Sequence, residues 1–487
     1  MALSNHPTLG KGEIPMGKRG FPPLVVGGMG FNVLGPSQVN EISRLGAAGT
    51  LSAAGLRNLI VSAVQNGDEK VIAMAKTFPF QKHIDELMLF APDGKWHKKA
   101  VPMDQVGPKG ESARMLTTIS VYVAVKIAKE GHSGVVLLNI MWKLADIVLP
   151  TIYGAMLADI DGLVFGAGVA MEAPDIVNKI RAGQFVYYDK LYSTNCQVSL
   201  EVHKGTAEFL AKFERPLLIP ILSNFAFCNL LLREWNARYG YGPDFFILED
   251  YRAGGHNAPP RNHIEHIEEK DGINTYFEKV LGLGVPIIVA GGLEHGGTRA
   301  DLLYCQEKKA FGMQVGSRFA LSKESNILQR LKDRIIRNNR RGRTRIITNY
   351  RSSPTGYPLK EIRLSGTLAR KSVLNKRRRS CKYGQLRQGN EKDTVKRSCP
   401  AMPSAMYRRL NPDKTLAQCR ADCRGKVCLC EALLAAVGML RSAAPPLVTM
   451  GESGRLVMKE ETIREIMEEI LTPQYVARME IELKIDS

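Results

Sequence analysis

The chain has 487 residues, a mass of 53.8 kDa and a net charge of +19, with 44% hydrophobic and 24% charged residues. This composition can form a large hydrophobic core and excludes a mainly disordered protein. The length favours one large domain with a smaller one beside it.

The first residues, "MALSNHPTLGKGEIPMG", have no apolar stretch, so we expect no signal peptide. The longest apolar run, residues 216–232, is broken by Pro220, Ser223 and Asn224. It indicates a buried strand followed by a helix, because a membrane span needs about 20 apolar residues. We therefore expect a cytoplasmic protein without a membrane span.

Eight short apolar runs, typical of strands buried on both faces of a parallel sheet, recur along the first two thirds of the chain. They cover residues 22–30, 48–53, 134–141, 161–168, 216–223, 244–250, 285–292 and 310–319. Segments with helical spacing, such as "PDIVNKIRAG" and "GTRADLLYCQEKKA", lie between them.

Eight β-then-α units predict an α/β fold, a (β/α)8 TIM barrel over residues 1–335. An open, doubly wound sheet would show similar units, and the count of eight favours the barrel. Residues 336–487 lack the repeat and predict a mixed, largely helical accessory domain, basic and rich in cysteine. Its last helix, within 459–471, has Ile463, Ile466, Met467 and Ile470 on one stripe, which predicts docking on the rest of the protein.

Glycines cluster where the predicted strands end, which is the face on which barrel enzymes build their sites. There they let the backbone approach a flat ligand and offer N–H groups to anions. The clusters after the last two strands, "AGGL" and "VGSRF", lie at a frequent phosphate site and predict a cofactor that carries a phosphate.

His256 follows two glycines after the sixth predicted strand, in "ILEDYRAGGHNAPPR". An imidazole there could act as an acid or base, and a loop histidine that bonds a neighbour fits the pattern equally well. Asn257 would orient the ring or a ligand carbonyl, and Pro259 and Pro260 stiffen the loop.

The ordered motifs "GGMG", "LLNIM", "DGLVFGAG", "IPILSN", "AGGHNAPPR", "IIVAGGL" and "GMQVGSRFALSKES" resemble the nitronate monooxygenase (2-nitropropane dioxygenase) family over about residues 20–330. That family is related to FMN-dependent enoyl-acyl-carrier-protein reductases. The tail motifs "SPTGYPLK" and "CLCEALLA" look like a long-chain branch with a C-terminal extension.

The resemblance implies FMN at the mouth of the barrel and makes His256 the match to the family's active-site histidine. The implied cofactor contacts run from the flavin ring to the phosphate: Gly28, Met29, Gly30, Asn139, Gly166, Gly254, Gly255, Gly291, Gly292, Gln314, Gly316 and Ser317. Asn257 would contact the substrate. The sequence departs from the family at Glu249, Asp250, Tyr251 and Arg252, whose size and charge would crowd or recharge the pocket.

The resemblance therefore predicts an FMN-dependent oxidoreductase that oxidises alkyl nitronates with O2. A first alternative is an enoyl-acyl-carrier-protein reductase with NAD(P)H as reductant. A second is an FMN-binding partner subunit without catalysis. The substrate would be a small molecule or an acyl thioester. The sequence is also compatible with a homo-oligomer.

The arginine-rich stretches 334–345 and 375–379 favour an acidic partner, which could be nucleic acid, an anionic lipid surface or an acidic protein, and a solvated charged linker fits them equally well. In the reductase alternative, the partner would be an acidic acyl carrier protein. The first stretch has no interleaved aromatic residues, which argues against nucleic acid. The nine cysteines lack the paired short spacings of zinc sites, and His263 with His266 fits a solvated helix start. We expect thiols and no metal.

Overall fold

The computed structural model describes residues 20–81, 84–88, 111–192, 197–256, 273–379, 383–384, 386, 388–390, 393–440 and 444–485. The expected Asn257 contact, the His263–His266 pair, Cys196 and Cys381 lie outside these residues. In the described part of the chain, none of the helices has the length and apolar character that crossing a membrane requires.

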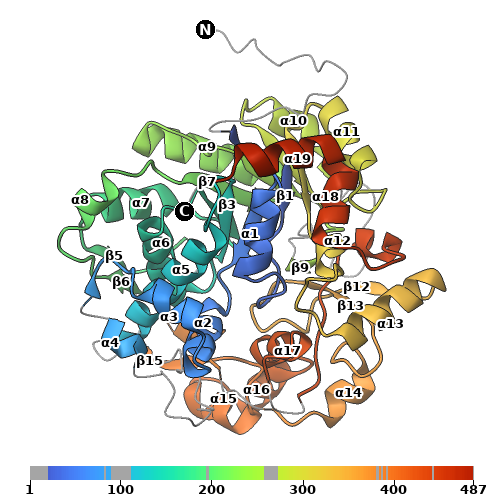
Figure 1. Ribbon diagram of the computed structural model, residues 1–487. Helices are drawn as coiled ribbons and strands as arrows, with labels where there is room; N and C mark the ends of the chain where they lie inside the picture. The colour runs from blue at the N-terminus through green and yellow to red at the C-terminus, as the bar shows by residue number, and fades with distance from the viewer. Residues whose placement is uncertain are drawn as a thin grey trace.

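Eight parallel strands close into a barrel in the order β1-β11-β10-β8-β7-β4-β3-β2, which confirms the predicted TIM barrel and excludes the open sheet (Figure 1). Each strand lies within one of the eight apolar runs. The strands are β1 (Leu24–Val26), β2 (Ala48–Ser52), β3 (Val136–Met141), β4 (Gly162–Gly166), β7 (Leu217–Leu222), β8 (Phe246–Glu249), β10 (Ile287–Ala290) and β11 (Gly312–Val315).

The strands are apolar on both sides because two separate cores cover them. Inside the barrel, side chains such as Val25, Leu137, Ile219 and Ile288 pack together with Phe245 at one end. The other face of each strand packs against the outer helices in one large cluster. This two-sided burial is why the sequence shows continuous apolar runs and not alternation.

The helices of the barrel region surround the sheet. They are α1 (Pro36–Arg44), α2 (Leu56–Gln65), α3 (Glu69–Ala75), α4 (Ile84–Met88), α5 (Glu111–Ala128), α6 (Ala145–Leu157), α7 (Ala173–Arg181), α8 (Thr206–Leu210), α9 (Phe225–Tyr239), η4 (Ile273–Thr275), α10 (Phe277–Leu281), α11 (Arg299–Glu307), α12 (Ser317–Ala320) and α13 (Gln329–Arg340). A hairpin of β5 (Val186–Tyr188) and β6 (Val198–Leu200) follows α7.

The C-terminal region starts with two strands that pair with a short one from the barrel. The sheet β12-β13-β9 joins β12 (Ile346–Asn349) and β13 (Leu359–Ile362) to β9 (Gly255–His256). The other elements are α14 (Lys371–Lys376), β14 (Gln388–Asn390), β15 (Asp393–Ser398), α15 (Ser404–Leu410), α16 (Leu416–Cys423), α17 (Leu429–Ala436), η5 (Glu452–Leu456), α18 (Ile463–Leu471) and α19 (Pro473–Glu482).

The C-terminal region divides between two places. Elements from β13 to α17 share a cluster of their own with Leu144 and Ile147 at the start of α6. The last two helices, α18 and α19, pack in the large cluster of the barrel, beside α1 and α11. The docking stripe predicted within residues 459–471 is thereby confirmed for α18, but this helix is not the last one, because α19 follows it. The expected boundary at residue 335 falls inside α13.

Candidate functional site

A cavity opens at the carboxyl ends of the barrel strands. All eight strands, or the residues that directly follow them, contribute to its lining, and it holds about 1470 Å³ of empty space with its open mouth included. Ligand sites of TIM barrels lie on this face.

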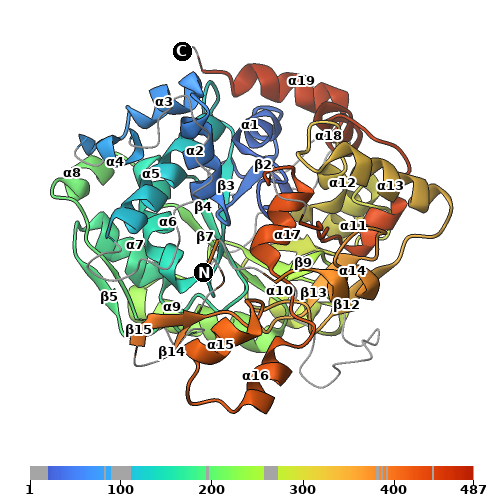
Figure 2. The same cartoon turned by 90° about the horizontal axis from the view of Figure 1, so that it is seen from below.

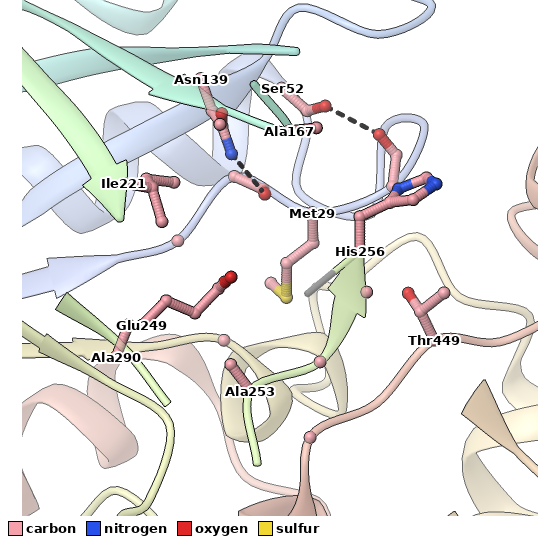
Figure 3. Close-up of a pocket in the computed structure, with 18 of the residues that line it drawn as sticks. Met29, Ser52, Asn139, Ala167, Ile221, Glu249, Ala253, His256, Ala290 and Thr449 are labelled. Carbon is pink, nitrogen blue, oxygen red and sulfur yellow. Dashed lines mark hydrogen bonds between the residues drawn. The ribbon is translucent and has the colours of Figure 1, made fainter. Parts of the chain in front are cut away.

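The loop after β1 forms one wall, and two side chains fix its backbone (Figure 3). The Ser52 hydroxyl donates to the Gly30 carbonyl oxygen at 2.8 Å, and the Asn139 amide donates to the Gly28 carbonyl oxygen at 3.3 Å. A Cβ atom on Gly28 would lie 2.9 Å from the Leu51 carbonyl oxygen. Only glycine therefore lets this strand end run so close to its neighbours.

The loops after β10 and β11 form the wall where the sequence predicts a phosphate. Gly291 and Gly292 have φ values of 75° and 68°, a region that glycine adopts without strain. Gly316 borders the cavity beside Met29, and the Ser317 hydroxyl accepts a hydrogen bond of 3.0 Å from the Gly451 amide. Backbone N–H groups and a hydroxyl group thus lie close together here, and these are the donors that bind phosphate in proteins.

Arg252 brings a positive charge to the same wall. Its Nη2 atom lies 2.6 Å from the position that a Cβ on Gly292 would take. Its guanidinium pairs with Asp250, with Nε 2.8 Å from Oδ1 and Nη2 3.3 Å from Oδ2. Asp250 is fully buried, so the pair holds the arginine against the glycine loop.

His256 lies on β9, at the edge of the cavity. Its Nε2 atom is 2.8 Å from the Ser353 hydroxyl, and that hydroxyl in turn lies 2.6 Å from the Thr355 hydroxyl. Burial, with a smaller contribution from the charge of Lys143, lowers the pKa of His256 to about 4. The imidazole is therefore neutral at pH 7, and Ser353 occupies one of its two nitrogens.

Glu249 is the last residue of β8, and its carboxyl group points into the cavity (Figure 3). Burial and the nearby charge of Asp250 raise the pKa of Glu249 to about 8. The four residues 249–252 therefore do not act as one crowding block. Asp250 and Arg252 neutralise each other, and Glu249 alone extends toward the centre.

The C-terminal region roofs the cavity with apolar side chains. Leu359 from β13, Leu386, and Leu429 and Leu433 from α17 line it, together with the segment 449–453. Figure 2 shows α17 and the β9-β13-β12 sheet on the same end of the barrel. No local pattern predicted this roof, because its residues lie 100 or more positions beyond most of the barrel's lining.

The predicted site residues come together in this one cavity. His256 and every implied cofactor residue line it except Gly292, whose neighbour Gly291 does so and which lies against Arg252. Sequence reasoning missed Ser52, Ser353 and the roof, and treated Glu249 and Arg252 only as departures. The position of Glu249 at a strand end was the signal that could have placed it in the site.

The residues present fit FMN. Glycine backbone at the ends of β1, β4, β10 and β11 leaves room for a flat ring system, and Asn139 and Gln314 offer amide groups along it. Ala167, directly after β4, lines the cavity with a φ of 52°, which is a strained conformation for a residue other than glycine. Such strain clusters at ligand sites.

The C-terminal cysteines lie apart from this chemistry. Cys399, Cys419, Cys423 and Cys430 are buried in the cluster of the accessory region, with Cys428 packed against it, and the described residues form no disulfide. Within the same described residues, no group of three or more His, Cys, Asp or Glu side chains could hold a metal ion.

Comparison with known proteins supports the resemblance drawn from the motifs. Residues 196–362 match the family model described as nitronate monooxygenase. This segment runs from β6 to β13 and includes Glu249, His256 and the glycines of the last two barrel strands. No curated protein matches the sequence.

Solved structures with a similar chain trace include two types of enzyme. FabK from Thermotoga maritima has a TM-score of 0.47 at 14% identity and covers 95% of this chain and 96% of its own. Nitroalkane oxidase from Streptomyces ansochromogenes has a TM-score of 0.44 at 11% identity over 96% of this chain and 98% of its own. The enoyl reductase domain of MlnA from Bacillus amyloliquefaciens has a TM-score of 0.48 at 12% identity over 95% of both chains. At these values the likeness does not identify a substrate.

Proposed function

Since residues 196–362 match the nitronate monooxygenase family, we propose that this chain is an FMN-dependent oxidoreductase that oxidises alkyl nitronates with O2. The observation that carries the proposal is that the matched segment supplies His256, Glu249 and the glycine loops of a single cavity. FMN, when bound, supplies the electron-accepting chemistry and the reaction with O2.

The walls of the cavity suggest how FMN would be held. Gly28, Met29 and Gly30 would lie along the ring, with Asn139 and Gln314 as amide partners. The phosphate would be held by the backbone of Gly291, Gly292 and Gly316 and by Ser317, with Arg252, whose charge Asp250 already balances, as a further N–H donor. Charge-assisted hydrogen bonds to phosphate are stronger than neutral ones, so Arg252 would add to the backbone contacts.

His256 would act as a neutral hydrogen-bonding group beside the substrate. Its Nε2 atom is engaged by Ser353, so Nδ1 is the nitrogen left for a ligand. A neutral imidazole with one ring nitrogen fixed keeps a single orientation. Asn257, as the neighbour of His256, would contact the substrate as well.

A second candidate is an enoyl-thioester reductase with NAD(P)H as the reductant. It is favoured by the roof of Leu359, Leu386, Leu429 and Leu433, which offers an apolar surface suited to an acyl chain. Its substrate could be delivered by an acidic acyl carrier protein, for which Arg340, Arg341, Arg343 and Arg345 present exposed charge. Arg343→Glu together with Arg345→Glu should then slow turnover of the carrier-bound thioester and leave the free thioester unaffected.

Turnover assays separate the candidates. The proposal predicts O2 uptake with propyl-2-nitronate by the FMN-loaded protein. NAD(P)H oxidation with a crotonyl thioester would favour the reductase instead, and neither activity despite bound FMN would leave a flavin-binding partner subunit.

The contribution of His256 has its own variant and control. His256→Ala should retain FMN and lose turnover by roughly 10-fold or more, because it removes a hydrogen bond to a charged substrate. His295→Ala removes an exposed histidine on the loop after β10 and should leave turnover unchanged. Full activity in His256→Ala would remove this residue from the mechanism.

A further inference from the structure

The carboxyl group of Glu249 stands alone in the cavity. Glu249 ends β8, where its backbone lies opposite Ala290 of β10, and Figure 3 shows the side chain reaching toward Met29. In the described part of the chain, the carboxyl group has no hydrogen-bond or ion-pair partner. Glu249 is partly buried and lines the cavity, so a ligand in the cavity can supply the partner that the described residues do not.

The charged groups around Glu249 give it no counter-ion. The strands on both sides, β7 and β10, carry no titratable side chain. The cavity's other titratable lining groups are Arg252, which is paired with Asp250, and His256, which is held by Ser353. Lys143 donates to the Thr355 carbonyl oxygen at 3.2 Å and lies over the Tyr357 ring, and its charge acts on His256.

An ionised Glu249 would therefore place a second negative charge, partly shielded from water, beside the buried Asp250. Burying a carboxylate without a partner costs far more than burying the neutral acid. The pKa of about 8 agrees with this geometry and leaves the acid protonated at neutral pH. The resting cavity then offers a ligand one carboxylic O–H group and one neutral imidazole.

We propose that Glu249 is kept as a carboxylic acid and donates its O–H group to a negatively charged oxygen of the bound substrate. In the proposed function that oxygen belongs to the nitronate, and only this assignment of the ligand rests on the proposed function. Because the cavity has no unpaired cation among its described lining residues, a hydrogen bond from a neutral O–H group is the means left to stabilise a planar anion there. The role also makes the acid necessary, since a carboxylate at the same place would repel the ligand.

The protonation state is tested without substrate. Infrared spectra of the FMN-loaded protein should contain, at pH 6, the C=O band of a protonated carboxyl group, and this band should decrease as the pH passes 8. Glu249→Gln should lack the band. Glu294→Gln, which removes an exposed carboxylate near Arg252, should retain it. Absence of a Glu249-dependent band at pH 6 would overturn the proposal.

The donor role is tested with isobutyrate, an unreactive planar anion with the branching of propyl-2-nitronate. Its affinity for the FMN-loaded protein, followed by the change in flavin absorbance, should fall about tenfold per pH unit above pH 8, as the competent fraction falls. Glu249→Gln, which still offers N–H donors, should bind isobutyrate with little pH dependence. Identical pH profiles in the two proteins, or no binding at pH 6, would contradict the donor role.

These experiments distinguish a failure of the role of Glu249 from a failure of the proposed function. A Glu249-dependent infrared band and a pH-dependent isobutyrate affinity without O2 uptake from propyl-2-nitronate would reject the proposed function and keep the acid. Nitronate turnover with a pH-independent isobutyrate affinity would reject the role of Glu249 and keep the function.

Discussion

Glu249 and His256 have pKa values that burial shifts in opposite directions, because burial disfavours the charged form of each. The carboxyl group is held protonated and the imidazole is held unprotonated. The sequence marked His256 as the group that handles protons near neutral pH. In the structure, Glu249 and not His256 has the pKa nearer to 7. The sequence could not show this, because the three-dimensional surroundings determine how far each group is desolvated.

Replacing Glu249 by Gln should change how stability depends on pH. The folded-state pKa of about 8 lies above the ordinary value of 4.5, so the folded protein binds the proton more tightly than the unfolded chain. The stability of the wild-type protein therefore falls between pH 4.5 and pH 8, by up to about 5 kcal/mol from this group. Glu249→Gln should lose that decline.

Urea unfolding at pH 5 and at pH 8 measures the difference. Relative to wild type, Glu249→Gln should gain a few kcal/mol of unfolding free energy at the higher pH, and Glu294→Gln should gain none. Parallel stability curves for wild type and Glu249→Gln would show that the pKa of this carboxyl group is not raised by folding.

Among the secondary-structure elements, the barrel strands could be predicted from the sequence, whereas β9 and the roof of the cavity could not. Eight apolar runs predict eight strands because each strand is buried on both faces. The strand β9 is different: its pairing of His256 with Leu359 joins segments about 100 residues apart, and no local periodicity marks it. The roof of α17 is equally long-range. The glycine loops were predictable because their residue type alone indicates close approach.

The turn between β8 and β9 carries the arginine assigned to the phosphate. Arg252→Met should reduce the preference for FMN over riboflavin by roughly 10- to 100-fold, the loss expected for a hydrogen bond to a charged group. Fluorescence titration of flavin-free protein with FMN and with riboflavin gives the ratio of the two affinities. A general loss of stability lowers both affinities alike and leaves this ratio unchanged. Arg252→Lys should lose less, and Arg238→Met, on exposed α9, should not change the ratio. An unchanged ratio in Arg252→Met would place the phosphate elsewhere.

In the whole molecule, the C-terminal region first covers the open end of the barrel with α17 and then packs α18 and α19 against the outside of the barrel. Arg318, which follows β11, is buried and forms ion pairs with two glutamates. Glu461 lies just before α18, and Glu469 lies within it. These contacts fix the last two helices on the barrel while the segment before them, 449–453, lines the cavity. The apolar stripe predicted the docking of α18, whereas its place beside α1 and α11 required the structure.

Shortening one residue of that stripe should destabilise the whole protein. Ile466 is 1% exposed, so Ile466→Ala should cost about 2–5 kcal/mol of unfolding free energy. Ile481→Ala, on α19 at 77% exposure, should cost little. Thermal or urea unfolding compares the two. Equal effects would show that α18 is not part of the barrel core.

Whether the cavity holds FMN is measured most directly by the FMN content of the purified protein, read from its visible spectrum and from flavin released on denaturation. We predict about one FMN per chain for wild type. Gly316→Val should lose it, because a side chain at this position enters the cavity beside Met29, where even a Cβ would lie 3.1 Å from the sulfur. Gly282→Val, at a helix end outside the cavity lining, should keep its FMN. A colourless wild-type protein that does not bind added FMN would contradict the account.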